Sequence, residues 1–369
     1  MKLAPGATAS RRLSGERVTR GSVWLYRLYD VAQEIDLLQA EELLAVEKPV
    51  SRLKLARVRP KALEFKNPPL TVELAGRPVR LGDWEFATAP SARLYDFGVL
   101  AIVVRLLLPE RFGYDDLRKL SVLLGDAGEF ESLFMSYRDE LVNALQPALA
   151  GVGFTGFAED FIVYFFETWP REWDPVPLLL GEPGTVSQEM RRETLRNQFS
   201  YGDDTTIITW DAALVCDPAG STDIPDLLEF ANAQLLELRY YDSLLDREVA
   251  AMYDAIEEAG RGGYRRLHKY RSIMRKMMEL VVEVTEITER VQNALKVTED
   301  VFYARVYTAA LKIFRVQEWL RSIERKVEVI ERNYAMLSDE LVTHRFLVLE
   351  VAIVVLITFE ILLWLWTLR

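Results

Sequence analysis

The chain has 369 residues, of which 50% are hydrophobic, so it can bury a sizeable core and still carry an extended segment. Its net charge of −11 excludes a general nucleic-acid-binding surface, because neutralising phosphates requires a basic field. The single cysteine, Cys216, excludes an intramolecular disulfide framework and fits a reducing compartment.

Residues 1–20 are predicted to form a flexible tail. The segment holds four arginines and one acid, Glu16, and this composition also resembles an organellar transit peptide. Because no apolar face at helical spacing accompanies the arginines, a disordered tail is the favoured interpretation. The arginines are Arg11, Arg12, Arg17 and Arg20.

Residues 21–220 alternate strand-like and helix-like segments and predict an α+β globular domain. Strands are predicted where β-branched and aromatic residues gather, and helices where apolar residues recur every three to four positions. The predicted strands cover residues 22–28, 52–59, 70–74, 94–108, 157–167 and 205–216. The predicted helices cover residues 31–45, 115–124, 130–149 and 187–197, and the proline-rich segment 169–184 is predicted to be a loop.

The segment 201–204 is the strongest candidate for a metal-binding or catalytic site in this domain. Its adjacent carboxylates, Asp203 and Asp204, precede a strand that leads to Asp211, and carboxylates of this kind can bind a divalent cation. However, neighbouring side chains of an extended strand point to opposite sides, and Gly and Asp are common turn residues. A structural turn is therefore the favoured interpretation of these candidate metal ligands.

No cofactor is predicted. His268 and His344 have no partner at metal-ligand spacing, and the sequence has no nucleophile elbow and no phosphate-binding glycine loop. We therefore expect a protein that is not an enzyme.

Residues 221–342 change to a helical composition and predict a stalk. A first helix is predicted over residues 221–260. Two heptad helices, over residues 264–297 and 306–341, are predicted to fold back on each other as an antiparallel hairpin through a turn near residues 298–300. The predicted seam of the last helix contains Val306, Ile313, Leu320, Ile323, Val327, Ile330, Leu337 and Leu341.

Residues 346–368 form the most apolar stretch and predict one transmembrane helix. At 1.5 Å per residue the stretch is roughly 34 Å long, which exceeds a hydrocarbon core of about 30 Å. Glu350 lies near one end and can reach the headgroups, whereas the deeper Glu360 predicts a packing or assembly contact. Trp364 and Trp366 suit an interfacial belt.

The expected topology places the body of the chain in the cytoplasm. No apolar signal sequence opens the chain, and basic residues are concentrated before the span. We therefore expect a single-pass, C-tail-anchored protein, with the bacterial inner membrane favoured over the mitochondrial inner membrane. The stalk and the span predict a homo-oligomer, and the head is expected to bind an unknown protein partner.

Several motifs in the C-terminal half resemble a known family. The segments 228–234 and 237–242, the helix 314–337 and a span with an internal Glu360 resemble the uncharacterised membrane-anchored family that includes the mitochondrial Required-for-Meiotic-Nuclear-Division proteins. Residues 95–99 resemble the aromatic-glycine strand motif of that family. The resemblance implies a non-enzymatic, self-assembling membrane anchor that is linked in organelles to the translation machinery.

The predicted function is a non-enzymatic membrane scaffold or tether. An α+β head, long stalk helices and a C-terminal span also resemble CorA-type divalent-cation channels, although the second span and the Gly-Met-Asn signature of that family are absent. The alternatives are therefore an oligomeric cation channel with rings of Glu360, and a metal-dependent enzyme that uses Asp203 and Asp204.

Overall fold

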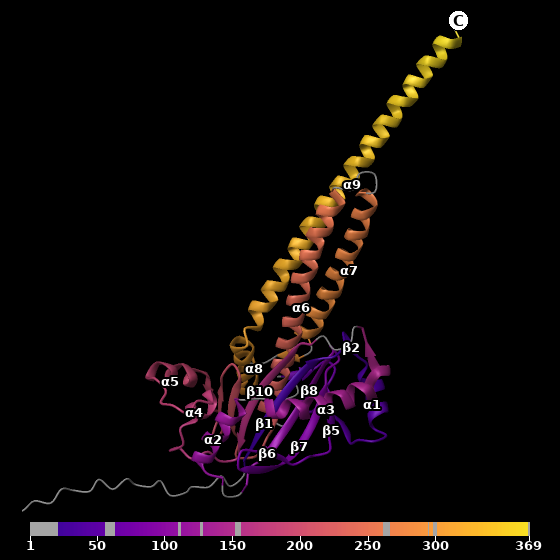
Figure 1. The fold of residues 1–369 in the computed structure, drawn as a ribbon. Helices are drawn as coiled ribbons and strands as arrows, with labels where there is room; N and C mark the ends of the chain where they lie inside the picture. Colours follow the sequence, from indigo (N-terminus) through magenta and orange to yellow (C-terminus); the bar gives the residue numbers. More distant parts are fainter. Residues whose placement is uncertain are drawn as a thin grey trace, which may run out of the picture. The chain divides into compact units, whose positions relative to one another are not determined.

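The structure is a computed structural model, and it describes residues 21–55, 63–109, 112–125, 128–151, 156–260, 266–293, 295–297 and 301–367 (Figure 1). The predicted tail over residues 1–20 lies outside the described residues. The chain divides into two compact units. The sheet unit contains Met1–Leu236 and Leu295–Phe314, and the bundle unit contains Glu237–Ala294 and Arg315–Arg369.

A ten-stranded sheet forms the centre of the sheet unit, which confirms a mixed α+β domain. Its main path runs β11, β12, β13, β10, β1, β8, β7, β5, β3, with β6 paired to β7. Strands β10 and β13 are parallel, and the other pairs are antiparallel. The strands are β1 (Gly21–Asp30), β3 (Val50–Arg52), β5 (Leu70–Glu73), β6 (Val79–Leu81), β7 (Trp84–Leu94), β8 (Val99–Leu107), β10 (Ala158–Phe166), β11 (Gln198–Phe199), β12 (Thr205–Ile208) and β13 (Ala212–Cys216). Two short pairs join β2 (Glu34–Ile35) to β9 (Leu149–Ala150), and β4 (Leu63–Phe65) to β14 (Leu295–Val297).

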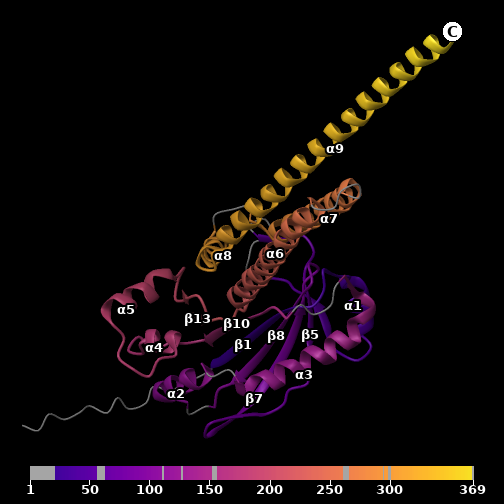
Figure 2. The ribbon, with the colours of Figure 1, turned by 45° about the horizontal axis from the view of Figure 1, so that its top comes forward.

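Helices cover one face of this sheet, and Figure 2 shows α3 lying along it. The helices are α1 (Leu37–Leu44), α2 (Tyr114–Leu124), α3 (Gly128–Leu145), α4 (Pro175–Leu180) and α5 (Gln188–Thr194). Leu100, Ile102 and Val104 of β8 belong to the hydrophobic core under these helices. Their neighbours Ala101 and Val103 point to the opposite face and are also buried. Burial on both faces explains why residues 99–104 of β8 form an uninterrupted apolar run.

The opposite face is covered by the start of α6 (Asp223–Gly260) and by α8 (Phe302–Ile313). The ring of Phe230 in α6 lies 5.7 Å from that of Tyr95 and 6.0 Å from that of Tyr307 in α8. Phe314, which follows α8, packs edge-on against Phe161 of β10 with ring centroids 5.6 Å apart. These aromatic contacts make the sheet the middle of three layers.

Several elements of the sheet unit differ from the sequence prediction. The predicted helix over residues 31–45 is replaced by β2 and the shorter α1, and the predicted strand over residues 205–216 is the antiparallel pair of β12 and β13. Strand β7 was not predicted, because apolar and polar residues alternate only weakly along it and because it contains Pro90. The Pro90 carbonyl accepts a hydrogen bond from the Leu74 N–H just beyond the last β5–β7 pair, so the missing proline N–H removes no ladder bond. Helix α4 lies in the predicted loop; Asp174 caps it through a 3.1 Å bond from the Val176 N–H, and Pro175 occupies its first turn.

The bundle unit contains the second part of α6, the helix α7 (Arg266–Asn293) and the helix α9 (Val316–Thr367). Lys326 of α9 forms ion pairs with Asp242 (2.8 Å) and Asp246 (2.7 Å) of α6. Helices α7 and α9 also pack against each other. The predicted two-helix coiled-coil hairpin is therefore not confirmed, because α6 takes part as a third helix.

The predicted heptad helix over residues 306–341 is interrupted. Arg315 has a φ of 53°, the left-handed conformation, and it separates α8 from α9. The predicted turn near residues 298–300 lies outside the described residues, and β14 before it and α8 after it belong to the sheet unit. The prediction of one continuous heptad helix was wrong. One face of α8 is buried against the sheet and one face of α9 is buried in the bundle, and together the two faces give an apolar periodicity that runs through the break.

Candidate functional site

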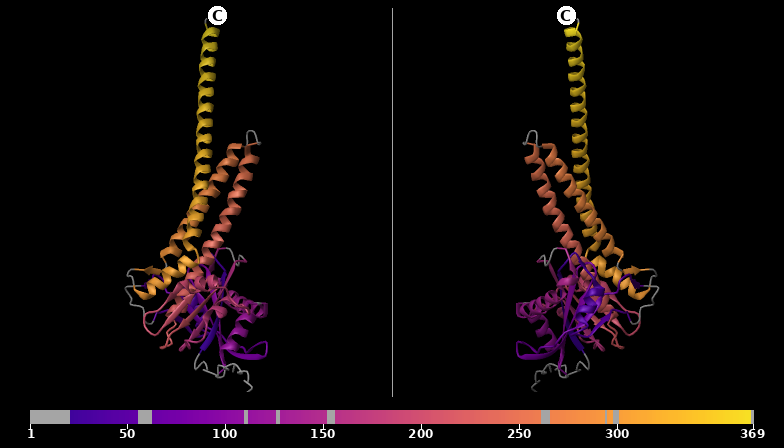
Figure 3. Two further views of the ribbon diagram at one scale, coloured as in Figure 1. Left: turned by 90° about the vertical axis from the view of Figure 1, so that its left-hand side faces the viewer. Right: turned by 90° about the vertical axis from the view of Figure 1, so that its right-hand side faces the viewer.

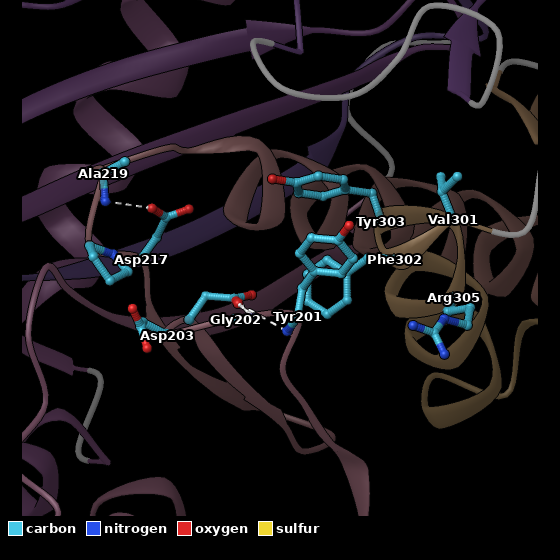
Figure 4. Close-up of a pocket in the computed structure, with 11 residues that line it drawn as sticks. Tyr201, Gly202, Asp203, Asp217, Ala219, Val301, Phe302, Tyr303 and Arg305 are labelled. Atoms are coloured by element: carbon cyan, nitrogen blue, oxygen red, sulfur yellow. Dashed lines mark hydrogen bonds between the residues drawn. The ribbon is translucent and has the colours of Figure 1, made fainter.

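A pocket of about 580 Å³ opens in the sheet unit where the β11–β12 turn, the segment after β13 and the start of α8 meet (Figure 4). It is lined by Tyr201, Gly202, Asp203, Asp204, Asp217, Pro218, Ala219, Val301, Phe302, Tyr303 and Arg305. The segment 201–204, which contains the candidate metal ligands Asp203 and Asp204, therefore forms one wall of a cavity.

The β11–β12 turn is held by its own side chains. Oδ1 of Asp204 accepts hydrogen bonds from the backbone N–H groups of Tyr201 (2.9 Å) and Gly202 (2.7 Å). The Ser200 hydroxyl donates to the carbonyls of Gly202 (3.1 Å) and Asp204 (2.7 Å). Since Asp204 serves the backbone, Asp203 is the exposed carboxylate of this turn.

The second wall follows β13 and contains the buried Asp217. Its N–H donates to the Phe166 carbonyl at 2.9 Å, and its Oδ1 accepts from the Ala219 N–H at 2.8 Å. Gly220 closes this turn with a φ of 69°, a conformation that glycine adopts without a Cβ clash. These bonds fix the position of the Asp217 carboxylate.

The third wall is the start of α8, and it is aromatic. The ring of Phe302 lies 5.8 Å from that of Tyr201 and 5.5 Å from that of Tyr303. In Figure 4 the Tyr303 hydroxyl points toward the side of the pocket where Asp217 lies. Arg305 lies on the opposite side in that view. The pocket thus has an acidic side, an aromatic middle and a basic side.

The three metal candidates are only partly brought together. Asp203 and Asp204 line the pocket, whereas Asp211 lies in the β12–β13 turn and accepts a 3.1 Å hydrogen bond from the Thr209 hydroxyl. Among the residues that the structure describes, no three His, Cys, Asp or Glu side chains form a group that could hold a metal ion. The geometry therefore offers no ligand set for metal chemistry at this turn.

A buried ionic cluster, which sequence reasoning missed, joins β7 to the start of α6. Arg93 donates to Glu229 at 2.8 Å, to Asp226 at 2.9 Å and to the Thr71 hydroxyl at 3.3 Å. The Tyr95 hydroxyl donates to the other oxygen of Glu229 at 2.9 Å. Burial raises the pKa of Glu229, and the charge of Asp226 raises it further.

Two motifs that carried the family resemblance meet in this cluster. Tyr95 belongs to the segment 95–99, and Glu229 and Phe230 belong to the segment 228–234. The Phe97 ring stacks on Tyr95 at 5.3 Å and meets the edge of Phe230 at 6.3 Å. The motifs therefore form a structural contact between a strand end and a helix.

The apolar part of α9 is exposed at every side chain that the structure describes there. Within Val316–Trp364 an 18-residue window has a mean hydropathy of 2.7 and none of it is buried, which makes α9 long and apolar enough to cross a membrane. Figure 3 shows this yellow segment of α9 extending beyond α6 and α7. Glu350 and Glu360 are exposed on it.

The predicted seam residues are divided between the two units. Val306 and Ile313 lie on α8 in the sheet unit, where Val306 is fully buried. In α9 the seam residue Val327 is half-buried. The buried seam residues of α9 are Leu320, Ile323, Ile330, Leu337 and Leu341.

Residues 20–222 match the family described as "Uncharacterized protein MJ0711, N-terminal domain". Over 239 residues the chain is 27% identical to Uncharacterized protein MJ0711 of Methanocaldococcus jannaschii, an alignment that covers 61% of this chain and 72% of that protein. No solved structure matches the chain. These similarities support an uncharacterised family, and they give no support to the resemblance to the mitochondrial Required-for-Meiotic-Nuclear-Division proteins.

Proposed function

The chain belongs to the family of the MJ0711 N-terminal domain, and we propose that it is a membrane tether. In this proposal residues 346–367 of α9 cross a lipid bilayer once and attach the sheet unit to that membrane as a scaffold for a partner protein. The observation that carries the proposal is the fully exposed apolar window of α9.

The energetics favour insertion of this segment. Its 22 residues, at 1.5 Å each, give roughly 33 Å, which matches a hydrocarbon core of about 30 Å. About fifteen Leu, Ile, Val and Phe side chains contribute roughly −5 to −9 kcal/mol on an insertion scale, against about +2.5 to +3.5 kcal/mol for one acid at the helix centre. The apolar side chains therefore outweigh Glu360, and Glu350 lies closer to one end, where its cost is smaller.

Alkaline extraction of membranes tests this proposal. We expect the full chain to stay in the membrane pellet, and the double variant Val355→Lys, Leu362→Lys to move to the supernatant, because both lysines lie within the span. The matched control is Met336→Lys, Val342→Lys, which changes two exposed apolar residues of the same helix outside the span, and it should stay in the pellet. Release of the unmodified chain by alkali would contradict the proposal.

Self-association of the span is the second part of the proposed function. Glu360 lies about four residues from the middle of the span, where a carboxyl group that faces lipid is costly. A second copy of the helix can cover this carboxyl and form a hydrogen bond with it. We expect the detergent-solubilised chain to be an oligomer by light scattering, Glu360→Leu to dissociate it, and Glu350→Leu to leave it intact. A monomeric unmodified chain would rule out this part.

A further inference from the structure

The pocket at the start of α8 has the dimensions of a small-molecule site, and the tether function does not use it. Its volume of about 580 Å³ lies within the range of roughly 300–1,000 Å³ that is usual for such sites. Its wall combines carboxylates, aromatic rings and backbone from three separate segments of the chain. This combination of groups restricts the chemistry of the ligand.

The charge of the lining favours a cation. Asp203, Asp204 and Asp217 outnumber Arg305, the basic residue of the lining, and Arg305 lies on the other side of the view in Figure 4. The chain as a whole carries a net charge of −11, which adds to the negative potential. An anion would be repelled from the acidic side of the pocket.

The aromatic middle favours a cation with a hydrocarbon body. Tyr201 is 82% exposed although its turn is held by the Asp204 carboxylate, so burial in the core does not account for the ring. Its contact with Phe302 extends the wall toward Tyr303. Ring faces attract ammonium groups and pack against the methyl or methylene groups attached to them.

An inorganic divalent cation does not fit this lining. Calcium takes six to eight oxygen ligands, and magnesium requires a nearly ideal octahedron. Oδ1 of Asp204 already accepts two backbone hydrogen bonds, and the described residues contain no group of three potential metal ligands. An ammonium group, by contrast, needs only one or two carboxylates and gains from the rings.

We propose that this pocket binds a small organic cation, a primary or quaternary ammonium compound with a short hydrocarbon body. The exposed Asp203 pairs with the ammonium group, and the buried Asp217 adds negative charge to the same side of the pocket. The rings of Tyr201, Phe302 and Tyr303 hold its hydrocarbon part.

Isothermal titration calorimetry of the full chain in detergent, with choline and putrescine as probes, tests this proposal. We expect saturable binding of at least one probe that weakens as NaCl rises. Asp203→Asn should weaken it about tenfold, as expected for loss of a hydrogen bond to a charged group. Tyr201→Ala should weaken it roughly two- to fivefold, as for an exposed cation–π contact, whereas Tyr201→Phe should retain it.

Asp211→Asn is the matched control, because Asp211 is an exposed carboxylate nearby in the sequence that does not line the pocket. Asp203 and Tyr201 are both exposed, so their variants should keep the unfolding temperature of the unmodified chain. The proposal is wrong if neither probe binds, if Asp203→Asn and Tyr201→Ala bind like Asp211→Asn, or if Mg²⁺ displaces the bound probe at an equal concentration.

Discussion

Replacing Arg93 by methionine should destabilise the sheet unit strongly at neutral pH. Methionine has a similar length, so the change mainly removes the guanidinium that joins β7 to the start of α6. The side-chain hydrogen bonds that then remain to the two carboxylates are those from the Tyr95 hydroxyl to Glu229, at 2.9 Å, and from the Thr222 hydroxyl to Asp226, at 3.1 Å. Both carboxylates stay buried, with 1% and 4% of their surface exposed.

The size of the effect follows from leaving two carboxylates in a desolvated site. Removing one partner of a buried ion pair typically costs about 3–5 kcal/mol, because the remaining charge is uncompensated. For a domain of about 200 residues, each kcal/mol lowers the unfolding temperature by roughly 2–4 °C, so we expect a decrease of about 6–20 °C. The exposed Arg80 in β6 provides the matched control, and Arg80→Met should change stability by less than about 0.5 kcal/mol.

The loss should depend on pH. Burial already raises the pKa of Glu229 above 4.5, and Arg93 opposes this rise, so the variant raises that pKa further. A carboxyl whose pKa is higher in the folded state binds more protons there, so stability falls as pH rises from the ordinary value through the raised one. The deficit of Arg93→Met should therefore be smaller at pH 5 than at pH 8. Adding Glu229→Gln should recover part of it at pH 8.

Thermal unfolding of the full chain in detergent, followed by tryptophan fluorescence, measures these differences. Trp24 lies on β1 with 3% of its surface exposed and reports on the sheet unit. A loss below about 1 kcal/mol for Arg93→Met would refute the importance of the ionic cluster. Equal deficits at pH 5 and pH 8 would refute the role assigned to Glu229.

Three further outcomes are expected. Ile330→Asp places a charge where 2% of the side chain is exposed, so trypsin should cut α7 faster than in the exposed control Glu331→Gln; equal digestion would contradict the packing of α9. Burial raises the pKa of the Cys216 thiol, so a disulfide reagent at pH 8 should react slowly with the folded chain and quickly in urea; fast labelling of the folded chain would contradict this. Tyr307→Phe removes a buried 2.5 Å hydrogen bond to Gln234 and should cost about 1–2 kcal/mol by thermal unfolding; an unchanged unfolding temperature would refute that contribution.

The sequence indicated only the acidic wall of the candidate pocket and not its aromatic wall. Asp203 and Asp204 are conspicuous as neighbours, but the aromatic wall is supplied by Phe302 and Tyr303, about a hundred residues later in the chain. The ionic cluster was missed for the same reason, since Arg93 and Glu229 are separated by 136 positions. Pairing of charges across such distances leaves no local pattern in one sequence.

The sequence by itself determined features that depend on local composition. The run in β8 is apolar because both of its faces are buried, and the segment 346–367 of α9 is predominantly apolar over 22 residues, so each can be recognised without knowing its neighbours. The change to a helical composition after Gly220 and the glycines from Gly260 onward likewise predicted a helix over residues 221–260, and α6 spans Asp223–Gly260.

Only the tertiary structure decided what each buried face packs against. Apolar periodicity continues from α8 into α9, yet Val306 is buried in the sheet unit and Ile330 in the bundle unit, with Arg315 between them in the left-handed conformation. Periodicity records that one side of a helix avoids water, and it does not record whether a sheet or another helix covers that side. The physical reason is that burial of apolar surface is non-directional, so the partner is selected by the fold of the whole chain.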